Sequence, residues 1–240
     1  MKIGVLALQG AFEEHAAVLK KLGAEVTEIR LPSHFEGLDG IILPGGESTA
    51  MALIGERWGV FPSLKQWVAD GRPVWGTCAG MILLSSKALM TKQGGQSLVG
   101  GMDVEVCRNY FGSQISSFEQ NLDMSGICPK DLQPYPAVFI RAPAILWVED
   151  PCIEVLAAVR AKPCSKAVRQ MKEVTDPVMA EKLKTFIDRA DEKSDPEVVV
   201  AARKGSILAT AFHPELTNDI RWHRYFLTMV ESFLSNKLAV

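Results

Sequence analysis

The sequence lacks the features that mark membrane proteins and nucleic-acid-binding proteins. No apolar stretch approaches the roughly 18 residues that a bilayer-spanning helix needs. The net charge is −2 and no basic block is present, so neither nucleic acid nor an anionic membrane is an expected partner. The first apolar stretch is interrupted by Gln9 and Glu13, too early for a secretion signal, and is expected to be a strand.

Cysteine and histidine are also scarce. Histidine occurs four times, never paired with another at metal-ligand spacing, so no metal site is expected. The number of cysteines is odd and none has C-x-x-C spacing, which argues against a disulfide framework and favours a reducing compartment, by default the cytoplasm. The five cysteines are Cys78, Cys107, Cys128, Cys152 and Cys164.

What the sequence does contain is an alternation of strand-like and helix-like segments in 240 residues, enough for one substantial core. Strands are predicted at 2–8, 25–31 and 39–43, with a helix at 11–22. This order predicts an α/β fold, a single domain with a mostly parallel sheet between two helical layers. Sites in such sheets lie beyond the carboxyl ends of the strands. Gln9, Gly46 and Cys78 fall at such ends and are expected to share one crevice.

The chain is organised around Cys78, which lies between a predicted buried strand at 73–75 and a predicted helix at 79–89. Gly76 and Gly80 flank it in a G-x-C-x-G pattern, the thiol counterpart of a nucleophile elbow. Small neighbours are needed there because a sharp strand-to-helix turn leaves no room for side chains. The helix N-terminus would favour the thiolate. The alternative is a buried structural cysteine.

Pro44-Gly45-Gly46 ends the third predicted strand, and Glu47 opens a helix. No G-x-G-x-x-G motif or P-loop lysine accompanies it, which counts against dinucleotides and nucleoside triphosphates. Paired glycines instead expose backbone N–H groups that suit a developing oxyanion. The alternative is a turn that only makes a tight bend.

His213-Pro-Glu215 follows the last predicted strand, at 205–212. The residue before a proline favours extended geometry, so His213 and Glu215 can point to the same side as a base and its orienting carboxylate. A hydrogen-bonded structural histidine is the alternative. Of the other histidines, His15 and His34 are expected to be structural or exposed, and His223, on a closing helix at 220–234, is expected at the surface.

The middle of the chain predicts strands at 101–108 and 137–141, which place Arg108 and Arg141 at strand ends. Arginine forks there could grip a substrate carboxylate, or they could be solvated. Segments 154–159 and 198–203 predict a hairpin. Residues 161–197 between them are expected to form a surface excursion with one amphipathic helix, or alternatively a helix that docks a partner.

Several motifs together carry a family resemblance. Gly76-Thr-Cys-Ala-Gly80, Leu43-Pro-Gly-Gly-Glu-Ser-Thr49 and His213-Pro-Glu215 resemble the class I, triad-type glutamine amidotransferases. Ile3-Gly-Val-Leu-Ala-Leu-Gln-Gly10, Arg108-Asn-Tyr-Phe-Gly112 and Val138-Phe-Ile-Arg-Ala-Pro143 resemble, more narrowly, the glutaminase subunits of pyridoxal 5′-phosphate synthase. The resemblance covers nearly the whole chain and implies one flavodoxin-like amidotransferase domain over residues 1–240. Residues 161–197 lie outside it and are expected to be a peripheral insertion.

The resemblance implies a role for individual residues. Cys78 would be the nucleophile, His213 the general base and acid, and Glu215 its orienting residue. Backbone N–H groups near Gly46 and Ala79 would form the oxyanion hole, and Gln9 would lie on the side that faces a partner. The implied contacts to L-glutamine come from Gly46, Glu47, Ser48, Arg108, Ile140 and Arg141.

The implied activity is hydrolysis of L-glutamine through a cysteinyl thioester, without a metal or organic cofactor. The ammonia would pass to a (β/α)8-barrel synthase subunit, in a large hetero-oligomer that makes pyridoxal 5′-phosphate. Three alternatives stay open: an amidotransferase subunit of another pathway, a non-catalytic scaffold, and a stand-alone cysteine hydrolase or peptidase.

Overall fold

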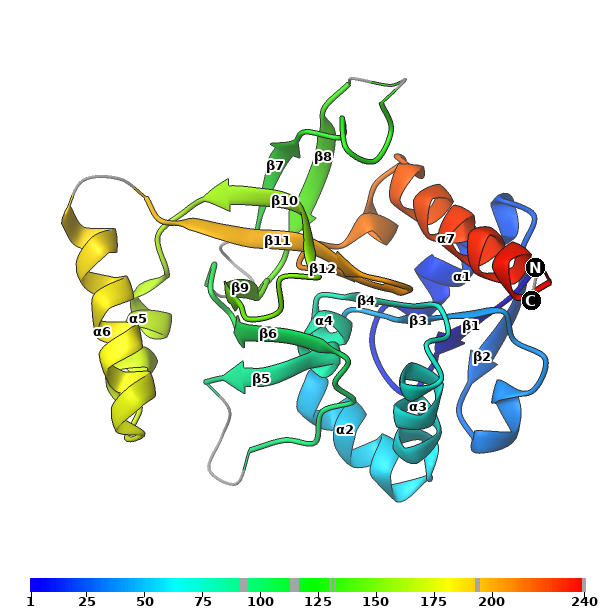
Figure 1. The fold of residues 1–240 in the computed structure, drawn as a ribbon, viewed down its shortest axis with the longest axis horizontal. Helices are drawn as coiled ribbons and strands as arrows, with labels where there is room; N and C mark the ends of the chain where they lie inside the picture. Colours follow the sequence, from blue (N-terminus) through cyan, green and yellow to red (C-terminus); the bar gives the residue numbers. More distant parts are fainter. Residues whose placement is uncertain (91–94, 113–116, 130, 132, 193–194, 239–240) are drawn as a thin grey trace.

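A curled sheet runs through the molecule, and helices cover both faces of its parallel part (Figure 1). The computed structural model describes residues 1–90, 95–112, 117–129, 131, 133–192 and 195–238. The strands are β1 (Lys2–Leu6), β2 (Glu25–Ile29), β3 (Gly40–Leu43), β4 (Val74–Thr77), β5 (Ser85–Leu89), β6 (Met102–Cys107), β7 (Phe118–Leu122), β8 (Tyr135–Phe139), β9 (Ala144–Val148), β10 (Glu154–Arg160), β11 (Glu197–Lys204) and β12 (Ile207–Thr210). The helices are α1 (Phe12–Lys21), α2 (Ser48–Arg57), α3 (Val60–Ala69), α4 (Ala79–Leu84), α5 (Ser165–Lys172), α6 (Pro177–Glu192) and α7 (Arg221–Leu238), with 3₁₀ turns η1 (Pro32–Phe35) and η3 (Pro214–Leu216).

Within the described residues, ten strands form one sheet in the order β2-β1-β3-β4-β12-β11-β9-β6-β5, with β10 paired to β11. Pairing is parallel from β2 to β12 and between β5 and β6. It is antiparallel where β11 meets β12, β10 and β9, and where β9 meets β6. Strands β7 and β8 form a separate antiparallel pair. The sheet therefore has a parallel half, β2 to β12, and a second half that begins at β11.

The parallel half is buried between two helical layers. Helices α1 and α7 lie on one face, and α2 and α3 lie on the other (Figure 1). Trp75 of β4 is fully buried, and its ring packs against His15 of α1 and Phe226 of α7. A buried parallel strand reads as a continuous apolar run, and Ile41 to Leu43 of β3 are fully buried. The predicted α/β alternation in this half is confirmed.

The predicted helix at 79–89 is wrong in its second part. Helix α4 ends at Leu84, and residues 85–89 form β5, which pairs in parallel with β6. The Ser85 hydroxyl donates a hydrogen bond to the Ile82 carbonyl at 2.7 Å, and the Leu83 carbonyl accepts from Val99 N–H at 2.8 Å. These carbonyls are taken by groups outside the helix ladder, and pairing with β6 then determines the conformation.

The segment between β10 and β11 contains two helices, α5 and α6, where the sequence predicts one. The predicted hairpin that carries it is confirmed, because β10 pairs antiparallel with β11. Met179, Leu183 and Ile187 of α6 are buried as their spacing predicts, and the Phe186 ring lies 6.0 Å from that of Trp147 in β9. The sequence prediction misses helix α5, which is short and mostly polar and buries only Ala167 and Met171.

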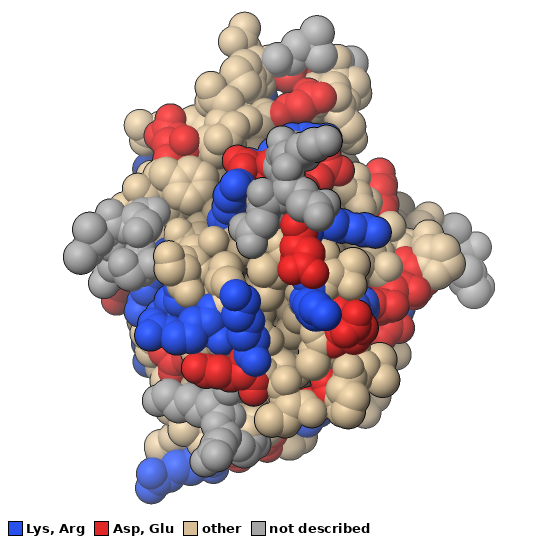
Figure 2. Space-filling view, turned by 90° about the vertical axis from the view of Figure 1, so that its left-hand side faces the viewer, with Lys and Arg blue, Asp and Glu red and all other residues tan. Residues whose placement is uncertain are grey.

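Charge of both signs covers the face that carries α5 and α6. Figure 2 shows groups of lysine and arginine side chains next to groups of aspartate and glutamate on this face. None of the helices in the described ranges is long and apolar enough to cross a membrane.

Candidate active site

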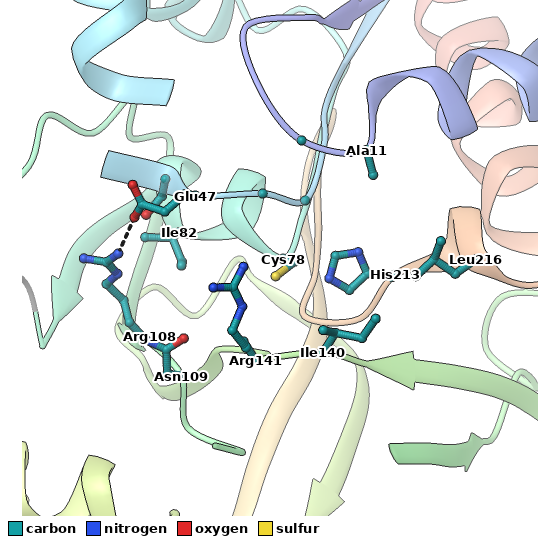
Figure 3. A pocket seen from close by; sticks show the side chains of 14 residues that line it. Ala11, Glu47, Cys78, Ile82, Arg108, Asn109, Ile140, Arg141, His213 and Leu216 are labelled. Carbon is teal, nitrogen blue, oxygen red and sulfur yellow. Dashed lines mark hydrogen bonds and ion pairs between the residues drawn. The ribbon is translucent and has the colours of Figure 1, made fainter. Parts of the chain in front are cut away.

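A cavity of about 310 Å³ opens where the two halves of the sheet meet. Its volume is at the lower end of the roughly 300–1,000 Å³ that is usual for small-molecule sites. Figure 3 shows Cys78 and His213 side by side in it, with Arg108 and Arg141 on the other side of the sulfur. The lining residues are Gly10, Ala11, Gly45, Gly46, Glu47, Ser48, Cys78, Ile82, Arg108, Asn109, Ile140, Arg141, His213 and Leu216.

Cys78 has the strained backbone that the elbow pattern predicts. Its φ is 47° and its ψ is −100°, between the end of β4 and the first residue of α4. The Cys78 N–H donates to the Thr210 carbonyl at 2.8 Å, which fixes the turn to β12. A Cβ on Gly80 would lie 2.0 Å from the Leu43 carbonyl oxygen, and one on Gly76 would lie 2.4 Å from Gly80. Side chains at these positions would therefore open the turn.

His213 is held next to Cys78 by its own backbone and by Glu215. The His213 N–H donates to the Val138 carbonyl at 2.8 Å, and ring Nδ1 lies 2.7 Å from Glu215 Oε1, within hydrogen-bond distance. Burial alone would lower the pKa of His213, but its contacts with the Cys78 sulfur and the Glu215 carboxylate outweigh burial and raise the pKa to about 10. Interactions of this kind stabilise the charged imidazolium. The geometry is that of a base with its orienting carboxylate.

Gly45 and Gly46 form the part of the cavity wall that lies beside Cys78 and His213. The Gly45 carbonyl accepts a hydrogen bond from Ala11 N–H at 3.0 Å. A Cβ on Gly45 would lie 2.3 Å from His213 Cε1 and 3.4 Å from Cys78 Cβ, so glycine is required for the backbone to approach the reacting groups. Ala79 begins α4, whose first N–H groups have no acceptor inside the helix. Ala79 therefore directly follows Cys78 in the chain, and Gly46 lines the same cavity as Cys78.

Glu47 links the two halves of the sheet across the cavity. Its carboxylate caps α2 by accepting from Thr49 N–H at 3.2 Å and Ala50 N–H at 2.8 Å. Arg108 Nη2, at the end of β6, donates to Glu47 Oε1 at 3.0 Å. Burial would raise the pKa of Glu47, but the two capping N–H groups and the Arg108 cation lower it below the usual value. An anion and a cation therefore stand together at one end of the cavity.

Backbone strain concentrates at this cavity. Four residues other than glycine have positive φ in the described part of the chain, and three of them line the cavity: Cys78 at 47°, Asn109 at 52° and Arg141 at 48°. Such conformations cost on the order of 1–3 kcal/mol each and persist where the surroundings enforce them. Their grouping supports this cavity as the candidate functional site.

The remaining predicted residues lie in or beside the cavity. Ile140 lines it, and the buried Ser48 lines it with a hydroxyl that donates to Gln96 Oε1 at 3.1 Å. Gln9 is half-buried, and its Oε1 accepts from Glu47 N–H at 2.7 Å. Glu215 is buried behind His213. Sequence reasoning did not single out Ala11, Ile82, Asn109 and Leu216 as lining residues.

The expectation that His223 lies at the surface is wrong, and His15 is fully buried rather than exposed. Their spacing carried a signal. His223 precedes the buried Phe226 and Val230 by three and seven residues, and His15 precedes Val18 and Leu19 by three and four residues. Residues at these spacings share one helix face, so both imidazoles point into the core.

Solved structures resemble this chain over almost its whole length. A crystal structure of a glutamine amidotransferase is 35% identical, has a TM-score of 0.72, and is matched over 95% of this chain and 98% of its own. A putative GMP synthase subunit from Thermoplasma acidophilum, 17% identical with a TM-score of 0.60, matches over 99% and 97% and shares the fold. Fold and cavity together define the glutamine amidotransferase class, and the predicted single α/β domain with a mostly parallel sheet is confirmed.

Within this class, the chain belongs to the SNO glutamine amidotransferase family, whose model matches residues 5–174 and 169–232. A probable pyridoxal 5′-phosphate synthase subunit PDX2 from Arabidopsis thaliana is 46% identical over 96% of this chain and 86% of its own length. The pyridoxal 5′-phosphate synthase subunit PdxT from Geobacillus thermodenitrificans is 41% identical over 96% of both chains. The resemblance predicted from the motifs is confirmed.

Proposed function

We propose that this chain is the glutaminase subunit of a pyridoxal 5′-phosphate synthase and hydrolyses L-glutamine to L-glutamate and ammonia. The family and the names of its full-length relatives support this function. The observation that carries it is the strained Cys78 beside a His213 ring that is held by Glu215, in a cavity with Glu47, Arg108 and Arg141. A cysteine paired with an oriented histidine is the arrangement that acyl transfer through a thioester requires.

In the first half of the reaction, the Cys78 thiolate attacks the side-chain carboxamide carbon of glutamine. The oxygen of that carboxamide gains negative charge, which the N–H groups of Gly46 and Ala79 would stabilise. The His213 imidazolium gives its proton to the departing nitrogen, so that ammonia leaves and a γ-glutamyl thioester remains. A pKa of His213 raised to about 10 keeps this proton available at neutral pH.

In the second half, water replaces ammonia. Once the sulfur is acylated it carries no negative charge, so the pKa of His213 falls and its neutral ring can accept a proton from water. The hydroxide attacks the thioester carbon, the C–S bond breaks, and glutamate leaves with the Cys78 thiolate restored. Glu215 holds the same ring nitrogen through both halves, which lets one histidine serve as acid and then as base.

The far end of the cavity suits the amino-acid part of glutamine. The Arg108 and Arg141 guanidinium groups would bind the α-carboxylate, and the Glu47 carboxylate would bind the α-ammonium group. Ser48, Gly46 and Ile140 would complete the wall on either side. Both charges of the substrate are then held at a fixed distance from Cys78, which positions the carboxamide for attack.

The ammonia would be delivered to a partner. By the family resemblance that partner is a (β/α)8-barrel synthase subunit in a large hetero-oligomer, docked on the side of Gln9 and α1. Residues 161–197, with α5 and α6, would be a peripheral insertion without a catalytic role. No metal or organic cofactor takes part in the proposed steps.

The test is ammonia release from glutamine by this chain with and without the synthase subunit. The proposed function predicts turnover that rises when the synthase is added, together with formation of pyridoxal 5′-phosphate from glutamine. A glutamine-analogue electrophile should label Cys78 under the same conditions. Turnover that supports another acceptor but never the synthase would overturn the pathway assignment, and absence of label on Cys78 would overturn the nucleophile.

A further inference from the structure

Behind the triad lies a buried polar cluster that the proposed reaction does not use. His15 of α1, Thr77 of β4 and His223 of α7 are all fully buried. They lie between Glu215 and the core, with the Trp75 ring packed against both imidazoles at 5.7 Å and 5.0 Å. Buried polar side chains are retained where their hydrogen bonds are satisfied, so the contacts of this cluster indicate its purpose.

The cluster leads from Glu215 into the core. Glu215 uses Oε1 for His213, and its Oε2 accepts no well-formed hydrogen bond among the described residues. His15 Nε2 lies 3.3 Å from Oε2 and 3.2 Å from the Thr77 hydroxyl. On the other side of the ring, His15 Nδ1 lies 3.0 Å from His223 Nε2. His223 Nδ1 has no partner within the described part of the chain.

These contacts determine which ring nitrogens carry protons. If His15 Nδ1 carried the proton, His223 would accept it at Nε2 and would bury an unpaired N–H at Nδ1, while a lone pair of His15 would face the Glu215 carboxylate. If His223 Nε2–H donates to His15 Nδ1, then His15 Nε2 carries the proton, 3.2 Å from the Thr77 hydroxyl oxygen and 3.3 Å from Glu215 Oε2, and only an acceptor, His223 Nδ1, is left unpaired. A buried unpaired donor and a lone pair against a carboxylate are both costly, so the second arrangement is favoured.

The charge state agrees with this arrangement. Burial lowers the pKa of His15 despite the nearby Glu215 carboxylate and the more distant Glu14. Burial also places the pKa of His223 well below its usual value. Both rings are therefore neutral near pH 7, and each has one proton to donate. Glu215 therefore has two histidine neighbours: the neutral His15 near Oε2 and the charged His213 at Oε1.

From this geometry we infer that His15 is a positioning residue for the triad: its protonated Nε2, hydrogen-bonded to the Thr77 hydroxyl and 3.3 Å from Glu215 Oε2, stabilises that second oxygen electrostatically. His223 sets the tautomer of His15. The inference rests on the proposed glutaminase function and deepens it. With Oε2 held, the Glu215 carboxylate keeps the orientation in which Oε1 meets His213. Without it, the carboxylate can turn and its pKa rises, so Glu215 stabilises the imidazolium less.

Two amide substitutions separate this role from packing. In His15→Gln the amide nitrogen occupies roughly the place of imidazole Nε2, whereas in His15→Asn it occupies roughly that of Nδ1. We expect His15→Asn to lower kcat for ammonia release about 10- to 100-fold in the presence of the synthase, as loss of an outer-shell partner does, with KM changed less than about twofold. His15→Gln should restore most of the activity. His34→Gln, at a half-buried position in η1 that does not line the cavity, is the matched control.

A second readout is the titration of the His213 ring, followed by NMR in the isolated chain. His15→Asn should lower the pKa of His213, and His15→Gln should leave it close to the wild-type value. If Asn and Gln reduce kcat equally, or if both leave the pKa of His213 unchanged, His15 acts through packing and the inference fails. If wild type itself releases no ammonia with the synthase, the proposed function fails instead, while the NMR comparison still judges His15. Should His15→Asn not fold, His223→Asn, which removes the donor to His15, takes its place with the same readouts.

Discussion

The two halves of the sheet contribute different parts of the same cavity. The parallel half carries the groups proposed to react, because Cys78 follows β4 and His213 follows β12. In the proposed function the second half supplies the arginines that bind the α-carboxylate, since Arg108 follows β6 and Arg141 lies between β8 and β9. Parallel strands end at one edge of a sheet, which brings the reacting groups together. The antiparallel part then closes this edge from the other side.

The two sets of residues are also held in different ways. Cys78 and His213 are fixed by backbone hydrogen bonds to Thr210 and Val138. Arg108 is fixed by a side-chain contact, the ion pair with Glu47 at 3.0 Å. Changes at Cys78 and His213 should therefore act on kcat, and changes at the two arginines of the second half on KM.

The largest effect is expected from removing the nucleophile. Cys78→Ala should lower glutamine turnover by a factor on the order of a thousand or more, since no other nucleophile lines the reacting end of the cavity in the described residues. The variant should still bind the synthase. Ammonia release measures the first effect and co-sedimentation the second. Glutaminase activity that survives the change would remove Cys78 from the mechanism.

The next largest effect is expected at Gly45. Gly45→Ala would place a Cβ 2.3 Å from His213 Cε1, and displacing the ring by about 1 Å can cost on the order of 100-fold in rate. The loss should appear in kcat with KM little changed. Gly126 is the matched control, because a Cβ there meets nothing within 4 Å. Equal activity of the two alanine variants would contradict the close approach at Gly45.

In the second half of the sheet, Arg108→Ala should act mainly on the KM for glutamine. A charge-assisted hydrogen bond contributes about 1.5–3 kcal/mol, so KM for glutamine should rise about 10- to 100-fold. Arg108→Lys keeps the charge but loses the fork geometry. Its KM should lie between those of the wild type and Arg108→Ala. Steady-state kinetics at saturating glutamine should show kcat within a few-fold of wild type. A loss confined to kcat would show that recognition and chemistry are not divided between the halves.

The pH dependence of stability tests the pairing of His213. Its pKa in the folded chain, about 10, lies above the ordinary 6.5. The pairing therefore stabilises the fold fully below about pH 6.5 and is lost as the pH rises through about 10. In Cys78→Ala the pKa of His213 should fall, so less stability is lost over this window. Denaturant unfolding from pH 6 to pH 10 measures both variants, and identical pH profiles would contradict the contact.

The smallest effect on activity is expected in α6. Leu183 is fully buried, and Leu183→Ala should lower the free energy of unfolding by about 2–5 kcal/mol while kcat and KM stay near wild type. Val178, which is 78% exposed, is the control and should change stability by less than about 0.5 kcal/mol. Altered kinetics in a folded Leu183→Ala protein would give the proposed insertion a role at the cavity.

The parallel half was predictable because its signals are local. Each buried strand is a short apolar run, and Gly76, Gly80 and Pro214 mark the turns where Cys78 and His213 lie. The second half depends on contacts distant in sequence. Ser85 to Leu89 fit a helix by spacing, yet they pair with Met102 to Cys107, and nothing local announces this register.

The site residues divide in the same way. Cys78, His213 and the glycines of residues 45–46 were predictable from pattern. Asn109 was not singled out, although asparagine tolerates the positive φ that it adopts there. The sequence prediction leaves His15 as structural or exposed and puts His223 at the surface, and only the spacing of their apolar neighbours indicates that both are buried.

The backbone bond from Ala11 to the Gly45 carbonyl has a consequence for how the molecule can be controlled. A Cβ on Gly10 would lie 1.9 Å from that same oxygen. The loop that enters α1 is therefore packed directly against the cavity wall, with no free space between the two backbones. A partner that displaces α1 should therefore also displace Gly45 and Gly46, which line the cavity beside Cys78. A small molecule that binds between this loop and the cavity wall should inhibit the protein without occupying the proposed glutamine site.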